Sequence, residues 1–273
     1  RLRVLNNYVD YFVIAESNLT FNGKQKPYNF AAVKEKFKAW EHKIIYLPVR
    51  QSADGLSFEN DTKYNPQSAA WKLENEQRNA LIAAAKYMSD EDMVLVSDLD
   101  EIPDPRILKK LKLPEEPMAF SLLFHYYFLN CQNVGTQSRW WQGCVVSSAK
   151  QFKEITPQGL RNNRDVYTSI KHGGWHFSFL GGADKIKYKI ESYAHTEYNS
   201  AEYADAAHIE QSIKEGKDVL KRDGVIFRFM PLSYYPVCMQ KLMKGYPQFL
   251  NIKPAGFLTN LYFTGRRVLK RRF

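Results

Sequence analysis

The chain is poor in cysteine and has no long apolar run. Its 273 residues include only three cysteines, Cys131, Cys144 and Cys238, which are irregularly spaced and form no CxxC pair. This pattern argues against a zinc site or a disulfide framework and favours a reducing compartment, with one disulfide plus a free thiol as the alternative. No segment reaches the roughly 18 apolar residues that a membrane span requires.

Acidic residues are outnumbered by basic ones. The chain has 29 Asp and Glu against 39 Lys and Arg, which gives a formal net charge of +10. A basic protein attracts anions such as diphosphate-bearing ligands, and no nucleic-acid partner is expected. Part of the excess lies in the tail, which we expect either to contact an anionic membrane surface or to be a solvated terminus. The tail residues are Arg266, Arg267, Lys270, Arg271 and Arg272.

The sequence also lacks a signal peptide and an initiator methionine. It begins at Arg1, inside a segment whose apolar residues have helical spacing. We therefore expect a trimmed chain whose upstream segment is not included. The expected location is the cytoplasm, with peripheral contact to a membrane, and a lumenal domain of a longer protein is the alternative.

Three carboxylates in four residues, Asp98, Asp100 and Glu101, are the most informative feature that is present. They follow the apolar run 93–96, which has the length and β-branched content of a buried strand, and Ile102-Pro103 is expected to end it. In open α/β sheets, ligands bind at the carboxyl ends of strands. Oxygen ligands placed there suit a divalent cation that holds substrate phosphates. A solvated turn is the alternative.

The apolar patterns predict an α/β fold. Strands are expected at 9–15, 43–49 and 93–97, with helices at 29–40 and 67–88 between them, which is the pattern of a mostly parallel sheet flanked by helices. Further strands are expected at 118–129, 140–148 and 175–179, and helices at 185–193 and 201–221. Without a linker, one domain is expected, with a donor half to about 105, an acceptor half at about 106–225 and an extension at about 226–273.

Two histidine-containing segments are candidates for polar contacts. Gly174, Trp175 and His176 lie in a glycine-rich stretch, where glycine allows close approach of backbone to ligand and Trp offers a sugar platform. A tight turn with a packed Trp is the alternative. His195 is a candidate third metal ligand, and complementing a helix dipole is the alternative role.

Further candidates lie near the first strand and on the long predicted helix. Glu16, Ser17 and Asn18 follow a strand, where a nucleotide base or ribose would lie. Arg78 suits a phosphate because a guanidinium matches phosphate geometry. Its alternative partner is Glu74, four residues earlier on the helix.

Five segments in this order resemble glycosyltransferase family 17: 10–24 with Lys26-Pro27, 76–79, 96–103, 173–178 and 194–197. The resemblance runs from residue 1 to about 200. It implies a GT-A-like nucleotide-diphospho-sugar transferase fold, a UDP-sugar donor carrying N-acetylglucosamine, a Mn²⁺ or Mg²⁺ ion, and inversion at the anomeric carbon. The acceptor is expected to be a glycan or a lipid-linked saccharide.

The resemblance also implies roles for single residues. Asp98, Asp100 and His195 become candidate metal ligands, with Asp98 also near the donor ribose. Lys24 or Arg78 would neutralise the diphosphate, and Gly174 and Trp175 would contact the donor. His176 is the first candidate for the base that deprotonates the acceptor, and Glu101 and Glu197 are the alternatives. A non-catalytic binding module of the same fold and a metal-dependent phosphodiesterase are the alternative functions.

Overall fold

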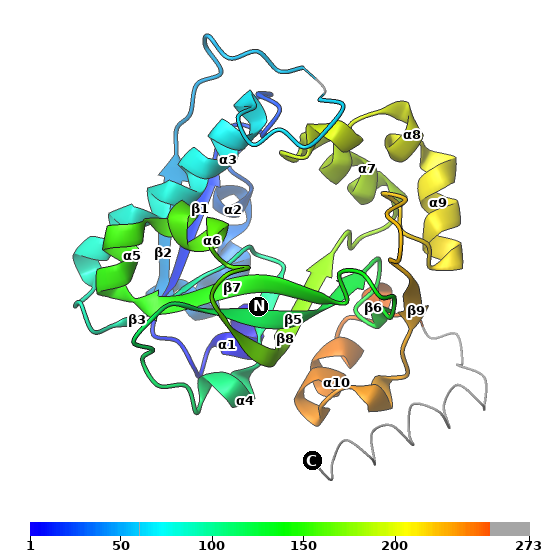
Figure 1. The fold of residues 1–273 in the computed structure, drawn as a ribbon. Coiled ribbons are helices and arrows are strands. Elements are labelled where there is room, and N and C mark those ends of the chain that lie inside the picture. Colours follow the sequence, from blue (N-terminus) through cyan, green and yellow to red (C-terminus); the bar gives the residue numbers. More distant parts are fainter. Residues whose placement is uncertain (60, 252–273) are drawn as a thin grey trace.

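A computed structural model describes residues 1–59 and 61–251 of the chain (Figure 1). The helices are α1 Leu2–Leu5, α2 Asn29–Val33, α3 Ala69–Asn79, α4 Pro105–Leu108, α5 Ala149–Ile155, α6 Pro157–Asn162, α7 Ala183–Ser192, α8 Ala201–Ala204, α9 Ala206–Glu215 and α10 Val237–Lys244. The strands are β1 Phe12–Ser17, β2 Ile44–Val49, β3 Met93–Val96, β4 Glu101–Pro103, β5 Met118–Tyr126, β6 Cys131–Asn133, β7 Trp140–Ser148, β8 Thr168–Ser178 and β9 Phe227–Phe229. Segments of 3₁₀ helix are Lys34–Lys43, Ala80–Tyr87, Thr196–Tyr198, Leu232–Tyr234 and Pro247–Phe249.

The predicted helices begin near the expected residues, and all except α7 are shorter than expected. Ser68 caps α3, because its hydroxyl accepts a hydrogen bond from the Trp71 amide, and the helix continues only as 3₁₀ helix after Asn79. The helix predicted at 201–221 is two helices, α8 and α9, because Asp205 caps the second one. Gly216, with φ of +68°, ends α9 in the left-handed conformation that glycine adopts without strain.

The strand pairing differs from the expected mostly parallel sheet. β1 and β2 pair in parallel as a separate two-stranded sheet. In the seven-stranded sheet only β5 and β8 are parallel, and the pairs β3–β7, β4–β8, β5–β6, β5–β7 and β6–β9 are antiparallel. The mixed α/β class is therefore confirmed, but the sheet is mostly antiparallel, since an apolar run indicates a strand without indicating its partner.

The acidic segment turns back into the sheet instead of ending it. β3 stops at Val96, the chain turns, and β4 then pairs antiparallel with β8, with Glu101 opposite His176 and Ile102 opposite Trp175. The expectation that Ile102-Pro103 ends the extended chain is wrong, because proline is tolerated in short strands that have a neighbour on one side only. This turn brings the carboxylates of the first half beside the glycine-rich segment of the second half.

Apolar side chains fill both faces of the larger sheet. Phe120, Leu122 and Val146 are buried between strands, and helices α7, α8 and α9 pack beside the sheet, yellow-green to yellow in Figure 1. The three cysteines are free, which agrees with the expected absence of a disulfide framework. Among residues 1–59 and 61–251, no helix combines the length and apolarity needed to cross a membrane. The basic tail at 266–272 lies outside the described residues.

Candidate active site

The turn between β3 and β4 holds Asp98 between two arginines. Its carboxylate lies 3.0 Å from Arg78 Nη2, on α3, and 2.6 Å from Arg161 Nη2, on α6. Burial opposes ionisation of Asp98, but Arg161 and Arg78 outweigh it and lower the pKa of this carboxyl to about 2. Asp98 is therefore a fixed negative charge at neutral pH.

Asp100 binds a different pair of side chains. Its two oxygens lie 3.3 Å from His176 Nε2 and 3.0 Å from Lys189 Nζ, on α7. Burial opposes ionisation here too, but Lys189 and His176 hold the pKa of Asp100 well below its usual range. The two aspartates thus lie in one turn, each facing its own basic partners.

Glu101 supports this turn through its own hydrogen bonds and ion pair. It is fully buried, and its carboxylate accepts hydrogen bonds from Trp141 Nε1 at 2.7 Å and from the Asp98 amide at 3.1 Å. Arg161 Nη2 lies 2.8 Å away. A carboxylate with all these partners and no exposed surface is placed to hold the turn, which leaves His176 and Glu197 as the better-placed base candidates.

His176 is enclosed by rings as well as by Asp100. Its imidazole stacks on Phe124 at 5.1 Å and lies 4.8 Å from Trp141, between ring centroids. Its Nδ1 is buried and has no hydrogen-bond partner among the described residues. A carboxylate on one ring nitrogen fixes the tautomer and leaves the other nitrogen as an acceptor, which is the arrangement of a general base.

His195 belongs to a second, aromatic cluster. Its Nδ1 lies 2.8 Å from Glu197 Oε1, and its ring contacts Tyr64, Trp71, Tyr193 and Tyr198. Within the described part of the chain, no group of three or more His, Cys, Asp or Glu side chains could hold a metal ion. The structure therefore does not bring His195 together with Asp98 and Asp100 as one ligand set.

One face of α3 links the two clusters. Trp71, Glu74, Asn75 and Arg78 follow helical spacing, so they line the same side of the helix. Trp71 contacts His195 and Arg78 contacts Asp98, seven residues apart, which corresponds to about 10 Å along the helix axis. Arg78 also binds Glu74 at 2.7 Å, so the alternative partner expected from the sequence is present, and the phosphate role stays a prediction.

The candidates next to β1 hold loops together. Glu16 accepts hydrogen bonds from the Asn29 and Phe30 amides and from the Tyr46 hydroxyl. Together with burial, it raises the pKa of Tyr46 to about 12. The neighbouring side chains serve the same purpose, since the hydroxyl of Ser17 accepts from the Leu19 amide and the amide group of Asn18 pairs with Gln51. Lys24 is exposed.

Two members of the glycine-rich segment face protein instead of a ligand. A Cβ on Gly174 would lie 2.2 Å from the Ile102 carbonyl oxygen, so this glycine permits close approach of β8 to β4. Trp175 is 3% exposed and packs with Met230, Tyr235 and Met239. The sugar platform expected at Trp175 is therefore corrected: its ring is buried in the core, and Trp141, two strands away, is the partly exposed indole beside His176.

Four further site residues carry no signal in the sequence. Arg161 and Arg164 lie in a polar run that reads as a solvated loop, and Lys189 is one of several lysines on α7. The Arg164 guanidinium lies 4.9 Å from the Trp141 ring centroid, and burial together with Arg161 lowers its pKa. Only the fold places these cations and Trp141 beside the acidic turn.

Buried polar atoms without partners concentrate around both clusters. Among the described residues, six of these atoms belong to the clusters or to the α3 face between them: Trp71 Nε1, Asn75 Oδ1, Arg161 Nη1, His176 Nδ1, Tyr193 Oη and Glu197 Oε2. Native proteins satisfy nearly all buried polar groups with protein or with bound molecules. The concentration of unpaired groups therefore makes this region the candidate ligand site.

Comparison with known proteins places the chain in a glycosyltransferase family. The family model described as glycosyltransferase family 17 matches residues 1–239, and the chain belongs to that family. The resemblance found from the motifs is thus confirmed.

The curated relatives are similar at low identity. The rat protein named beta-1,4-mannosyl-glycoprotein 4-beta-N-acetylglucosaminyltransferase is 22% identical over 287 residues, covering 91% of this chain and 50% of its own length. The human protein of the same name is 23% identical over 224 residues, covering 70% of this chain and 40% of its own. The chain spans about half the length of these relatives or less. No solved structure matches it significantly.

Proposed function

We propose that the chain transfers N-acetylglucosamine from a UDP-sugar to a hydroxyl group of a glycan or lipid-linked saccharide, with inversion, in a GT-A-like domain. The observation that carries the proposal is the acidic turn, where two aspartates separated by one residue meet three cationic side chains, Arg78, Arg161 and Lys189. Relatives named for N-acetylglucosaminyl transfer support the choice of sugar.

The charges around the turn favour a divalent cation. Four carboxylates, of Glu74, Asp98, Asp100 and Glu101, stand against four cations, of Arg78, Arg161, Arg164 and Lys189. A donor diphosphate adds negative charge to this balanced set. Mn²⁺ or Mg²⁺ would offset it and stabilise the leaving diphosphate.

Among the described residues, Asp100 is the side chain that fits such an ion. Asp100 is 27% exposed, and a carboxylate has about four lone-pair sites, so Lys189 and His176 do not exhaust its capacity. One or two carboxylates plus substrate phosphates are sufficient to bind Mg²⁺. Asp100, with Asp98 beside it, is the proposed protein ligand, and His195 has no part in it.

Protein side chains then have separate roles. Arg161 and Arg164 offer guanidinium groups for phosphate, one with an unpaired Nη1 and the other stacked on Trp141. His176, oriented by Asp100, accepts the proton of the acceptor hydroxyl on Nδ1. The aromatic cluster around His195 offers ring faces for a sugar.

The test is UDP release from UDP-N-acetylglucosamine in the presence of Mn²⁺ and a panel of glycan and lipid-linked acceptors. Asp100→Ala should lower turnover by about 10³-fold or more, because it removes the proposed metal ligand and the partner of His176. Asp165→Asn is the matched control, since Asp165 is an exposed carboxylate near Arg164 and should leave turnover unchanged. Full activity of Asp100→Ala would refute the site assignment.

A further inference from the structure

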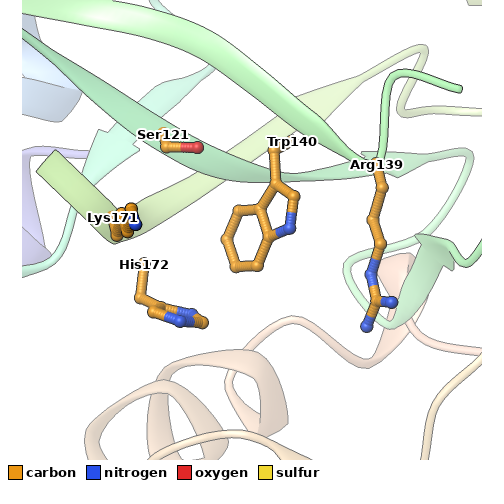
Figure 2. Close-up of a pocket in the computed structure, with 5 residues that line it drawn as sticks. All are labelled: Ser121, Arg139, Trp140, Lys171 and His172. Carbon is orange, nitrogen blue, oxygen red and sulfur yellow. The ribbon is translucent and has the colours of Figure 1, made fainter. Parts of the chain in front are cut away.

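A pocket lies on the face of the larger sheet opposite the acidic turn. It has a volume of about 250 Å³ and is lined by Ser121, Arg139, Trp140, Lys171 and His172. Successive side chains of a strand point to opposite faces, so Trp141 faces Glu101 and His176 while Trp140 faces this pocket. Figure 2 shows Trp140 and Arg139 extending from the start of β7 to the same side, with His172 facing Trp140.

Distortions in two strands build the pocket. β8 takes four residue steps, from Ile170 to Gly174, where β5 takes two, from Phe120 to Leu122. The extra residues of β8 include Lys171 and His172, and His172 has a φ of +56°, which is rare outside glycine. β7 is irregular at the same level, opposite Ser121. Bulges of this kind redirect side chains next to functional sites.

The lining is cationic and aromatic. Arg139 and Lys171 supply positive charge, and none of the five lining residues is acidic. Arg139 Nε is buried and has no hydrogen-bond partner within the described residues, and Ser121 adds a buried hydroxyl residue to the lining. The indole of Trp140 meets the His172 ring edge-on at 4.8 Å and remains partly exposed.

These groups have complementary preferences. A guanidinium and an ammonium bind phosphate or carboxylate through charge-assisted hydrogen bonds. An indole face binds the C–H face of a sugar ring, and a hydroxyl next to it pairs with a sugar hydroxyl. The volume lies just below the roughly 300 Å³ of the smallest pockets for drug-sized ligands, so it suits a single substituted ring.

We propose that this pocket binds a saccharide unit that carries a negative charge, as phosphate or carboxylate. Arg139 and Lys171 bind the anionic group, and Trp140 stacks on the ring. The site is separate from the acidic turn and does not depend on transfer activity.

Isothermal titration of the full chain with glucose 6-phosphate, glucuronate and glucose tests the proposal. At least one charged probe should bind about tenfold or more tightly than glucose, and the tighter one identifies the anionic group. Arg139→Gln and Lys171→Gln should each weaken that probe about tenfold. Trp140→Leu should reduce its affinity to that of inorganic phosphate, because the ring contact is lost.

Controls separate this site from the other basic regions. Lys150→Gln removes an exposed lysine of α5, and Asp98→Asn alters the acidic turn, so both should leave the probe affinity unchanged. Equal affinity for all three probes, or loss of binding in Asp98→Asn but not in Lys171→Gln, would overturn the proposal. So would binding only to vesicles of phosphatidylcholine and phosphatidylserine that disappears in Arg139→Gln, since that result would make the pocket a membrane contact.

Discussion

Two histidine–carboxylate pairs of this chain share their chemistry but differ in their surroundings. His176–Asp100 lies among charged groups, next to Lys189 and one turn residue away from the Arg78–Asp98–Arg161 set. His195–Glu197 lies among rings and has no comparable set of cations within the described chain. In each pair a carboxylate contacts one imidazole nitrogen, so any difference in function between the pairs must come from the side chains around them.

The side chains around the two pairs favour different roles for them. Fixed charges act strongly on a ligand that is itself charged, so the His176 pair suits the diphosphate and the reacting centre. Ring faces bind a neutral sugar through its C–H groups without requiring charge. We therefore expect the His195 pair to position a sugar ring about 10 Å along α3 from the reacting centre.

The largest expected contrast comes from removing each histidine in turn. His176→Ala should lower kcat by about 10²–10³-fold, the usual contribution of a general base, while UDP affinity changes little. His195→Ala should act mainly on KM, by about tenfold, because it removes a positioning contact. Initial rates of UDP release and the Kd for UDP measure both.

The opposite pattern would break the comparison. Loss of UDP binding in His176→Ala would make that residue a donor ligand, and a fall in kcat confined to His195→Ala would move the base to the second pair. Glu197→Gln is the matched variant for the second pair, because it keeps a side chain of the same length that can still hydrogen bond His195 Nδ1. It should lower kcat by less than His176→Ala does.

The sequence predicts one of these pairs much better than the other. Asp98 and Asp100 could be located because a short motif follows an apolar run, which is local information. His176 was singled out through the family resemblance. The pairing of His176 with Asp100 depends on β4 returning to β8, and no pattern in the sequence reveals this antiparallel contact.

The errors have the same origin. The resemblance implies a donor contact for Trp175 and an alternative base in Glu101, yet Trp175 faces the core and Glu101 is enclosed by Arg161 and Trp141. Which side of a short strand faces a ligand is set by its partner strand, and a register change of one residue reverses it. Cations from α6 and α7 enter the site for the same tertiary reason.

A third histidine shows what burial does without a carboxylate. His125 is fully buried, between the Leu123 carbonyl oxygen and the Tyr235 hydroxyl. Burial lowers the pKa of His125 to about 3, so the unfolded chain, near 6.5, binds the proton first. Stability from this residue is present above pH 6.5 and is lost as the pH falls towards 3.

Urea unfolding at pH 7 and pH 5 measures this loss. Between these values the wild-type chain should lose about 2 kcal/mol that His125→Gln does not lose, because glutamine does not titrate. The comparison uses the change in the free energy of unfolding between the two pH values, so a lower overall stability of the variant does not affect it. Identical changes in the two proteins would show that the pKa of His125 is the same in the folded and the unfolded chain, and that burial alone does not separate it from the two paired histidines.

The smallest expected effect tests one cation near the His176 pair, Arg164, whose guanidinium lies over the Trp141 ring. Arg164 has one weak ion pair, 3.7 Å to Asp165, so removing it leaves no strong partner unpaired. Burial and Arg161 lower the pKa of Arg164 because both disfavour its charged form, and an arriving phosphate would favour that form. Arg164→Gln should weaken UDP binding by about tenfold and leave the thermal midpoint close to that of wild type.

Lys150→Gln, an equal change in net charge on α5, separates this local effect from general attraction of an anion to a basic protein. If both variants weakened UDP binding equally, the site would attract UDP only through the long-range electrostatic field of the protein. Phosphate binding would then no longer support the contrast between a charged and an aromatic histidine pair.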